Sequence, residues 1–283
     1  MKKILSVIAI CLLHFSLMGQ SNYKNFTDLE EAMKNPELVE VLMLNAKGLT
    51  SFPDQIFGFK NLKYLELTNN QITMLPEDLG SLTNLFYFNL SGNKISKLPE
   101  SFSKLESLRN LYLDYETPES LDQDFILLSK LPLLHVLEIS GEKINDLPSS
   151  VGLLQNLEYF ELLNSHVEIL PTEFSGLQKL QVLYINNDDS FNFQKNIDIL
   201  SQLPNLSELH LEGDYFTKIP SEINRLQSIE YLFLNNNKLV ELPSEIYDLK
   251  NLKYIDISNN EIPNHLLYRY HEYMAPTISI RLK

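Results

Sequence analysis

The chain has 283 residues, of which 44% are hydrophobic and 21% are charged, and its formal net charge at pH 7 is −14. This hydrophobic content is too high for an intrinsically disordered chain. The negative charge argues against nucleic acid and anionic membrane surfaces as partners, because both would repel the protein.

The first segment, residues 1–19, has the features of a secretory signal peptide. Two lysines precede an apolar run over residues 4–18, which is too short for a membrane-spanning helix. Lipidation at Cys11, the single cysteine, is the alternative, and the bulky Ile10 before it argues against that interpretation. We therefore expect removal of residues 1–19 and no membrane insertion of the mature chain.

The mature chain would contain no cysteine, so it would be stabilised by burial alone. Together with the Met-Lys-Lys start, this favours an exported bacterial protein that resides in the periplasm, on the cell surface or outside the cell.

Residues 20–37 have the pattern of an amino-terminal cap helix. Thr27 and Glu30 have the spacing of a capping box, and Phe26 precedes them at the position of a hydrophobic staple. The sequence predicts that this helix covers the first strand.

Residues 38–262 repeat one pattern, which is clearest in LKYLELTNNQITMLPEDLGSLTN from Leu62 onward. The step is 23 residues, or 26 in the units that start at Leu108 and Leu180. A fixed period of this length indicates a repeat array in which each unit contacts its neighbours. The first apolar position of each unit is Val39, Leu62, Leu85, Leu108, Leu134, Leu157, Leu180, Leu206, Ile229 or Leu252.

The two long units and the end of the chain depart from the basic pattern. We expect longer outer helices near Phe125–Leu128 and Ile197–Leu200, at equivalent positions of two units that lie three repeats apart. Residues 263–283 are expected to form a carboxy-terminal cap helix and a closing strand at Thr277–Leu282. In that strand, Ile278 and Ile280 follow Ile255 and Ile257 by one ordinary repeat step.

The consensus LxxLxLxxNxLxxLPxxIxxL resembles the leucine-rich repeat superfamily in its 23-residue LPxxI form. The resemblance implies an α/β fold, namely a curved right-handed solenoid with a parallel β-sheet on its concave face and short helices and turns on its convex face. It also implies protein binding without a cofactor. The consensus asparagine is kept only at Asn70, Asn93, Asn237 and Asn260.

Function is expected at the strand positions that point away from the core. In YLEL, Leu65 and Leu67 point one way, and Tyr64 and Glu66 point the other. Tyrosine is common at binding hot spots, although it also simply suits strands. The candidate ligand-binding residues on the concave face are Tyr184, His210, Phe233, Tyr231, Tyr254, Asp256, Tyr112, Glu138, Glu161, Tyr64 and Tyr87.

Two groups of side chains have residue types that could carry catalysis or bind a metal ion. Glu138 and Glu161 are neighbouring carboxylates, as in glycosidases, but an open face does not exclude water and acids there are expected to be solvated. Glu208, His210 and Glu212 alternate on one strand without a demanding metal-ligand spacing. We therefore expect neither catalytic residues nor a metal or cofactor.

The sequence thus predicts a non-catalytic protein-binding module that recognises a partner with basic residues through an acidic, tyrosine-rich concave face. The alternative is a carbohydrate-binding or adhesive surface protein, in which tyrosine rings would stack on sugars.

Overall fold

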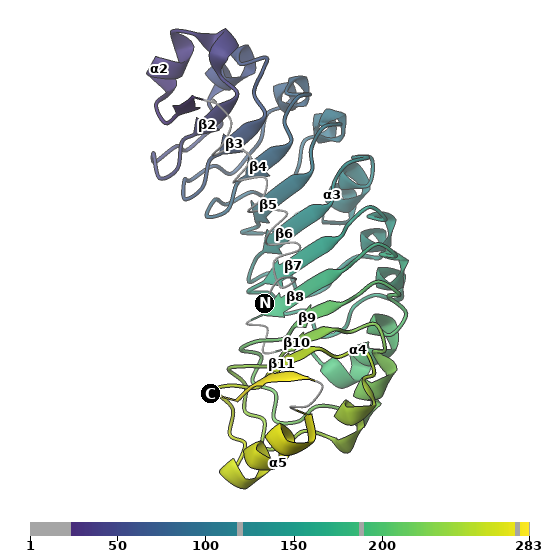
Figure 1. The fold of residues 1–283 in the computed structure, drawn as a ribbon. Coiled ribbons are helices and arrows are strands. Elements are labelled where there is room, and N and C mark those ends of the chain that lie inside the picture. The colour runs from purple at the N-terminus through teal and green to yellow at the C-terminus, as the bar shows by residue number, and fades with distance from the viewer. Residues whose placement is uncertain (1–23, 118–120, 187–189, 275–277, 283) are drawn as a thin grey trace.

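The computed structural model describes residues 24–117, 121–186, 190–274 and 278–282. The expected signal peptide, residues 1–19, lies outside the described residues. The chain forms one parallel sheet of twelve strands in the order β1 to β12, and the stack curves as an arc (Figure 1). The predicted leucine-rich repeat solenoid is therefore confirmed. Within the described ranges, no helix has the length and apolar character needed to cross a bilayer.

The cap helix begins one residue later than predicted, and a strand that the sequence did not predict precedes it. β1 (Asn25–Phe26) pairs with β2 (Val41–Met43), and Phe26 is buried in the core. α2 (Leu29–Met33) begins after Asp28, whose side chain accepts a hydrogen bond from the Glu31 amide at 2.9 Å. The expected cap at Thr27 is wrong because the pairing of β1 keeps the chain extended and delays the helix. A 3₁₀ turn follows at Pro36–Leu38.

Successive strands keep the repeat in register, so that equivalent positions of neighbouring units lie side by side. Leu65, for example, pairs with Phe88. The remaining strands are β3 (Tyr64–Glu66), β4 (Tyr87–Asn89), β5 (Asn110–Asp114), β6 (Val136–Ser140), β7 (Tyr159–Leu163), β8 (Val182–Asn186), β9 (Glu208–His210), β10 (Tyr231–Phe233), β11 (Tyr254–Asp256) and β12 (Ser279–Arg281).

Most units return to the sheet through a short 3₁₀ turn. The proline of the LP motif precedes each turn, where its fixed φ suits the start of a helix. These turns are Asp54–Gly58, Glu77–Ser81, Glu100–Lys104, Ser149–Leu153, Thr172–Gly176, Ser221–Arg225 and Ser244–Asp248.

Three α-helices replace the turn elsewhere: α3 (Leu121–Leu128), α4 (Phe193–Leu200) and α5 (Asn264–Met274). Figure 1 places α3 and α4 on the outer side of the arc. The closing strand β12 pairs Ile255 with Ile280 and Asp256 with Arg281. The expected pairing of Ile255 with Ile278 is therefore wrong by two positions, because α5 is longer than the turn it replaces.

Each of these helices supplies one buried side chain to a backbone amide of the preceding LP segment. The three amides occupy equivalent positions in units that lie three repeats apart, so the correspondence between the two long units extends to the unit that precedes α5. The bonds are Leu98 N to Asp124 Oδ1 at 3.0 Å, Leu170 N to Asn196 Oδ1 at 2.7 Å and Leu242 N to the Tyr270 hydroxyl at 2.7 Å.

The asparagines at the four consensus positions satisfy the backbone where the chain leaves β3, β4, β10 and β11. Asn70 accepts from the amides of Lys47 and Leu49, both at 3.0 Å, and donates to the carbonyls of Leu44 and Leu67. Such bonds keep the loop against the core, so the opposite face of the sheet is left for contacts.

Candidate functional site

The concave face is built from aligned columns of strand residues. We define the first column by the residues in register with Tyr64, and the central column by those in register with Glu66. Because neighbouring strands are about 4.8 Å apart, side chains of one column touch across strands. The central column consists of Met43, Glu66, Asn89, Tyr112, Glu138, Glu161, Tyr184, His210, Phe233, Asp256 and Arg281.

Five rings form a continuous stack across β7 to β11, which we call the carboxy-terminal ladder: Tyr159, Tyr184, His210, Phe233 and Tyr254. The His210 ring centroid is 3.6 Å from that of Tyr184 and 4.0 Å from that of Phe233, with interplanar angles of 12° and 7°. Tyr159 and Tyr254 close the two ends at 5.3 Å in tilted geometry. The predicted neighbours are thus in direct contact.

A shorter amino-terminal ladder consists of Tyr64, Tyr87 and Tyr112 on β3 to β5. Tyr64 and Tyr87 stack at 4.1 Å and 7°, and Tyr112 is tilted against Tyr87 at 5.3 Å. Glu138 on β6 lies between the two ladders in the central column.

Tyrosines of the first column hydrogen-bond to carboxylates two residues later on the same strand. The hydroxyls of Tyr64 and Tyr159 donate to Glu66 and Glu161. Burial, with help from these negative neighbours, raises the pKa of both tyrosines far above the ordinary value. The hydroxyls therefore stay protonated and hold the carboxylates in place.

Carboxylates on the middle strands are less solvated than the sequence suggested. Burial, followed by the charges of Glu161 and Asp114, raises the pKa of Glu138 to about 7. Burial also raises the pKa of Glu161 and of Asp114. Among the described residues, no hydrogen bond or ion pair involves the Glu138 carboxylate. A cation bound at this part of the face would therefore favour the charged form of these carboxylates.

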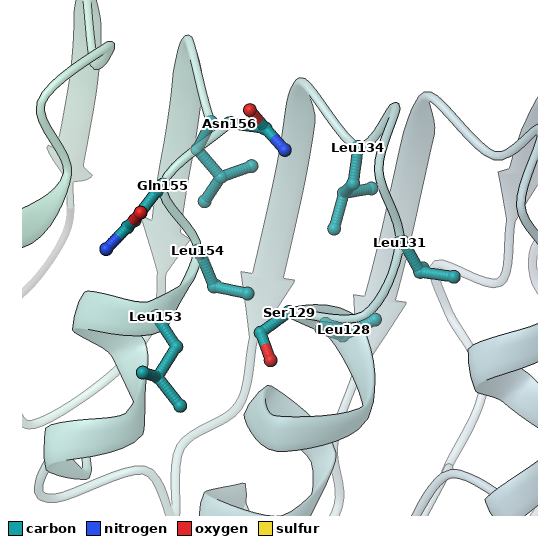
Figure 2. A pocket seen from close by; sticks show the side chains of 9 residues that line it. Leu128, Ser129, Leu131, Leu134, Leu153, Leu154, Gln155 and Asn156 are labelled. Carbon is teal, nitrogen blue, oxygen red and sulfur yellow. The ribbon is translucent and has the colours of Figure 1, made fainter.

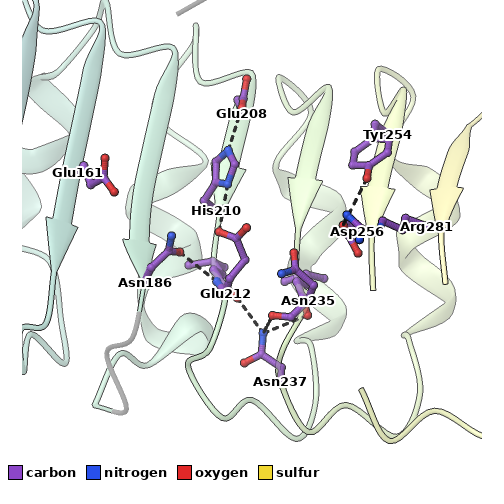
Figure 3. Close-up of polar contacts among 12 residues, drawn as sticks. Glu161, Asn186, Glu208, His210, Glu212, Asn235, Asn237, Tyr254, Asp256 and Arg281 are labelled. Atoms are coloured by element: carbon purple, nitrogen blue, oxygen red, sulfur yellow. Dashed lines mark hydrogen bonds and ion pairs between the residues drawn. The ribbon is translucent and has the colours of Figure 1, made fainter. Parts of the chain in front are cut away.

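His210 is held by both of its ring nitrogens (Figure 3). Nε2 lies 2.8 Å from Glu208 Oε1, and Nδ1 lies 3.1 Å from Glu212 Oε2. The backbone amide of Glu212 in turn donates to Asn186 Oδ1 at 3.0 Å. Because both nitrogens are engaged, the ring has no free position for a metal ion. In the part of the chain that the structure describes, no group of three or more His, Cys, Asp or Glu side chains could hold a metal ion.

Asp256 forms an ion pair with Arg281 of the closing strand, with Nη1 and Oδ2 at 3.4 Å (Figure 3). The Tyr254 hydroxyl donates to the same carboxylate at 3.3 Å, and the amide of Ser258 donates to Oδ1 at 2.9 Å. Arg281 was not among the predicted site residues, because the expected register of β12, which is wrong by two positions, did not place it in the central column.

The structure separates the candidate residues into two groups. Tyr64, His210 and Asp256 are only 3–5% exposed. Stacked rings or hydrogen-bonded neighbours cover them, so their part in a binding surface would be to position the residues around them. The half-buried candidates, which retain accessible atoms, are Tyr87, Tyr112, Glu138, Glu161, Tyr184, Tyr231, Phe233 and Tyr254.

A small hollow of about 150 Å³ lies away from these columns (Figure 2). Its lining comes from the segment that ends α3 and from the segment after the 3₁₀ turn Ser149–Leu153, and leucines predominate. None of its lining residues belongs to the concave columns, so it has no part in the candidate site.

Comparisons with known proteins agree with this architecture. The family model described as leucine rich repeat matches residues 37–95, 60–117 and 204–262. No sequence among curated proteins matches the chain significantly.

Solved structures resemble the chain in fold. A TLR13–ssRNA13 complex superposes with a TM-score of 0.70 and 24% identity over 92% of this chain and 39% of that one. The Toll–Spatzle complex of Drosophila gives 0.60 and 20% over 92% and 40%. An internalin (inlF) from Listeria monocytogenes gives 0.53 and 18% over 90% and 87%. The chain thus spans about two fifths of the two receptor chains.

Proposed function

We propose, from the premise that this chain belongs to the leucine-rich repeat superfamily, that it is an exported, non-catalytic module which binds a protein partner with basic residues on its concave face. The observation that carries the proposal is the juxtaposition of the two aromatic ladders with the half-buried carboxylates of Glu138 and Glu161. Aromatic anchors beside unsatisfied negative charge suit a polypeptide with lysine or arginine.

The ion pair between Asp256 and Arg281 supports this choice of partner. Here a guanidinium occupies the central column beside a tyrosine-bound carboxylate. Tyr159 and Glu161 form an equivalent pair, and no ion pair involves Glu161 within the described residues. A basic side chain of a partner would make at Glu161 the kind of contact that Arg281 makes at Asp256.

Carbohydrate binding is the weaker alternative, for a geometric reason. Sugars stack on exposed ring faces, whereas the faces of His210 and the facing sides of Tyr184 and Phe233 cover one another at 3.6 and 4.0 Å. These rings offer mainly edges and hydroxyls to a ligand. Such groups suit the mixed polar and apolar surface of a polypeptide.

Similar structures fit a role in binding, although they contribute only their fold. The Drosophila structure is a complex of Toll with Spatzle, and the internalin is from Listeria monocytogenes. The TLR13 structure contains single-stranded RNA, but the net charge of −14 opposes such a ligand for this chain. The proposed export depends on residues 1–19, and the final site is the periplasm, the cell surface or the medium.

The test compares the mature protein on a glycan array with its capture of proteins from an envelope extract. We expect one or more captured proteins, with binding that weakens several-fold as salt rises, because exposed charge pairs are screened. A glycan that binds independently of salt, with no protein captured, would replace the proposal by its alternative.

A further inference from the structure

The central ring of the carboxy-terminal ladder is a histidine that is almost fully enclosed. His210 is 5% exposed, and both faces and both nitrogens of its ring are in contact with other side chains. Its two faces stack on the rings of Tyr184 and Phe233, and its two nitrogens are within hydrogen-bond distance of Glu208 and Glu212.

This arrangement demands an extra proton. A neutral imidazole has one N–H donor and one lone pair, so it can donate to only one of the two carboxylates. The second nitrogen would then face a carboxylate oxygen across a hydrogen-bond distance, which is repulsive unless a proton lies between them. The triad of Glu208, His210 and Glu212 therefore holds one proton more than a neutral imidazole carries, so that each ring nitrogen donates to one carboxylate.

The stacked rings add to the same requirement. A cationic ring between two aromatic faces is attracted by their negative π-systems, and a neutral ring loses this attraction. Burial alone would lower the pKa of His210, but the hydrogen bonds and charges of Glu208 and Glu212 outweigh it and raise the pKa above its ordinary value of 6.5. Glu161 on β7, two strands from His210, also favours the charged ring, because the two opposite charges attract each other.

We propose that the proton on His210 regulates the concave face: the charged ring braces the carboxy-terminal ladder through Glu208 and Glu212, and loss of the proton loosens it. The proposal deepens the proposed function and rests on it, since it concerns the regulation of the same surface. The direction of the pH dependence follows from the raised pKa of His210. The bracing is complete below pH 6.5 and is lost as the pH rises through the higher value in the folded protein.

The test is a pH titration of the isotope-labelled mature protein by NMR, which needs no partner. The signals of His210 are identified among the five histidines that follow residue 19 by their loss in His210→Gln. We expect protons on both ring nitrogens at neutral pH, and at higher pH the loss of one proton together with shifts and broadening of the Tyr184 and Phe233 ring signals. An ordinary histidine titration, or ring signals that ignore it, would overturn the proposal.

Glu212→Gln is the discriminating variant. A glutamine amide can donate to the lone pair of Nδ1, so a neutral His210 would keep both bonds. We expect this variant to lower the His210 pKa and to keep the Tyr184 and Phe233 signals constant over the range in which the wild type changes. A merely structural histidine would give no such rescue, and an unaltered titration would contradict the brace. Failure here leaves the proposed function intact, because partner capture and glycan binding are measured separately.

Discussion

Replacing Asp124 by asparagine should stabilise the protein, and by an amount that depends on pH. Asp124 on α3 is buried, and its carboxylate accepts hydrogen bonds from the Leu98 amide at 3.0 Å and from the Tyr115 hydroxyl at 2.8 Å. Burial outweighs these bonds and raises the pKa of Asp124 from 3.8 to about 6. An asparagine can keep both partners, since its oxygen accepts from Leu98 and its amide can donate to the Tyr115 oxygen.

The magnitude follows from proton linkage. A tenfold change in proton affinity corresponds to about 1.4 kcal/mol, so the raised pKa of Asp124 costs the folded state about 3 kcal/mol once the group is charged. The raised value means that stability is lost as the pH climbs from about 4 to about 6 and then stays constant. Asp124→Asn should therefore be more stable than the wild type by up to about 3 kcal/mol at pH 8 and nearly equal to it at pH 4.

Urea unfolding at the two pH values measures this difference. The matched control is Asn196→Asp, which places the charged group at the equivalent position of α4, three repeats later in the chain. Asn196 donates to the carbonyls of Glu168 and Asn192, so the aspartate would face two acceptors and destabilise the protein most at high pH. If Asp124→Asn were destabilising at pH 8, or if its effect were the same at both pH values, burial of the charge would not be the dominant cost.

Three further predictions concern the core, the closing strand and the face. Leu162→Asp should lower the free energy of unfolding by more than about 4 kcal/mol, because it removes roughly 1.5–3 kcal/mol of apolar burial and buries a charge. The control is Leu153→Asp at a half-exposed site, which should lower it by less than about 1 kcal/mol. A chain that ends at Met274 lacks β12 and should melt at a lower temperature, and equal melting would contradict the role of β12 as a closing strand. The pKa of Glu138 is about 7, so its carboxylate becomes charged between pH 6 and pH 8. Affinity for a basic partner should rise roughly fivefold over this range, which corresponds to about 1 kcal/mol of binding free energy. Glu138→Gln should flatten that rise.

The period of the sequence was sufficient to predict the sheet and the alignment of its columns. Each unit contributes one strand, so residues at the same repeat position, such as Tyr184, His210 and Phe233, become neighbours whether the step is 23 or 26 residues. The same logic failed at the two ends. At β12 the longer helix α5 shifts the register by two positions, and at Thr27 the pairing of β1 delays the helix.

Burial within the concave face could not be read from the columns. The sequence treats Glu138 and Glu161 as solvated acids, because outward-pointing strand positions usually face water. In the structure the ladders on either side shield them and raise their pKa values. The bond from Leu98 to Asp124 was equally hidden, since it depends on how the outer helix packs against an earlier unit.

Capture of the partner with the double variant Tyr184→Ala, Phe233→Ala shows most directly whether the carboxy-terminal ladder is the binding surface. The matched control is Tyr268→Ala, Tyr273→Ala, which removes two tyrosines of α5 that are 79% and 65% exposed and lie outside the columns. Both variants should remain folded by circular dichroism. We predict that the ladder variant loses at least tenfold in partner affinity while the control binds like the wild type. Equal affinity of the ladder variant and the wild type would contradict the proposal that this ladder binds the partner.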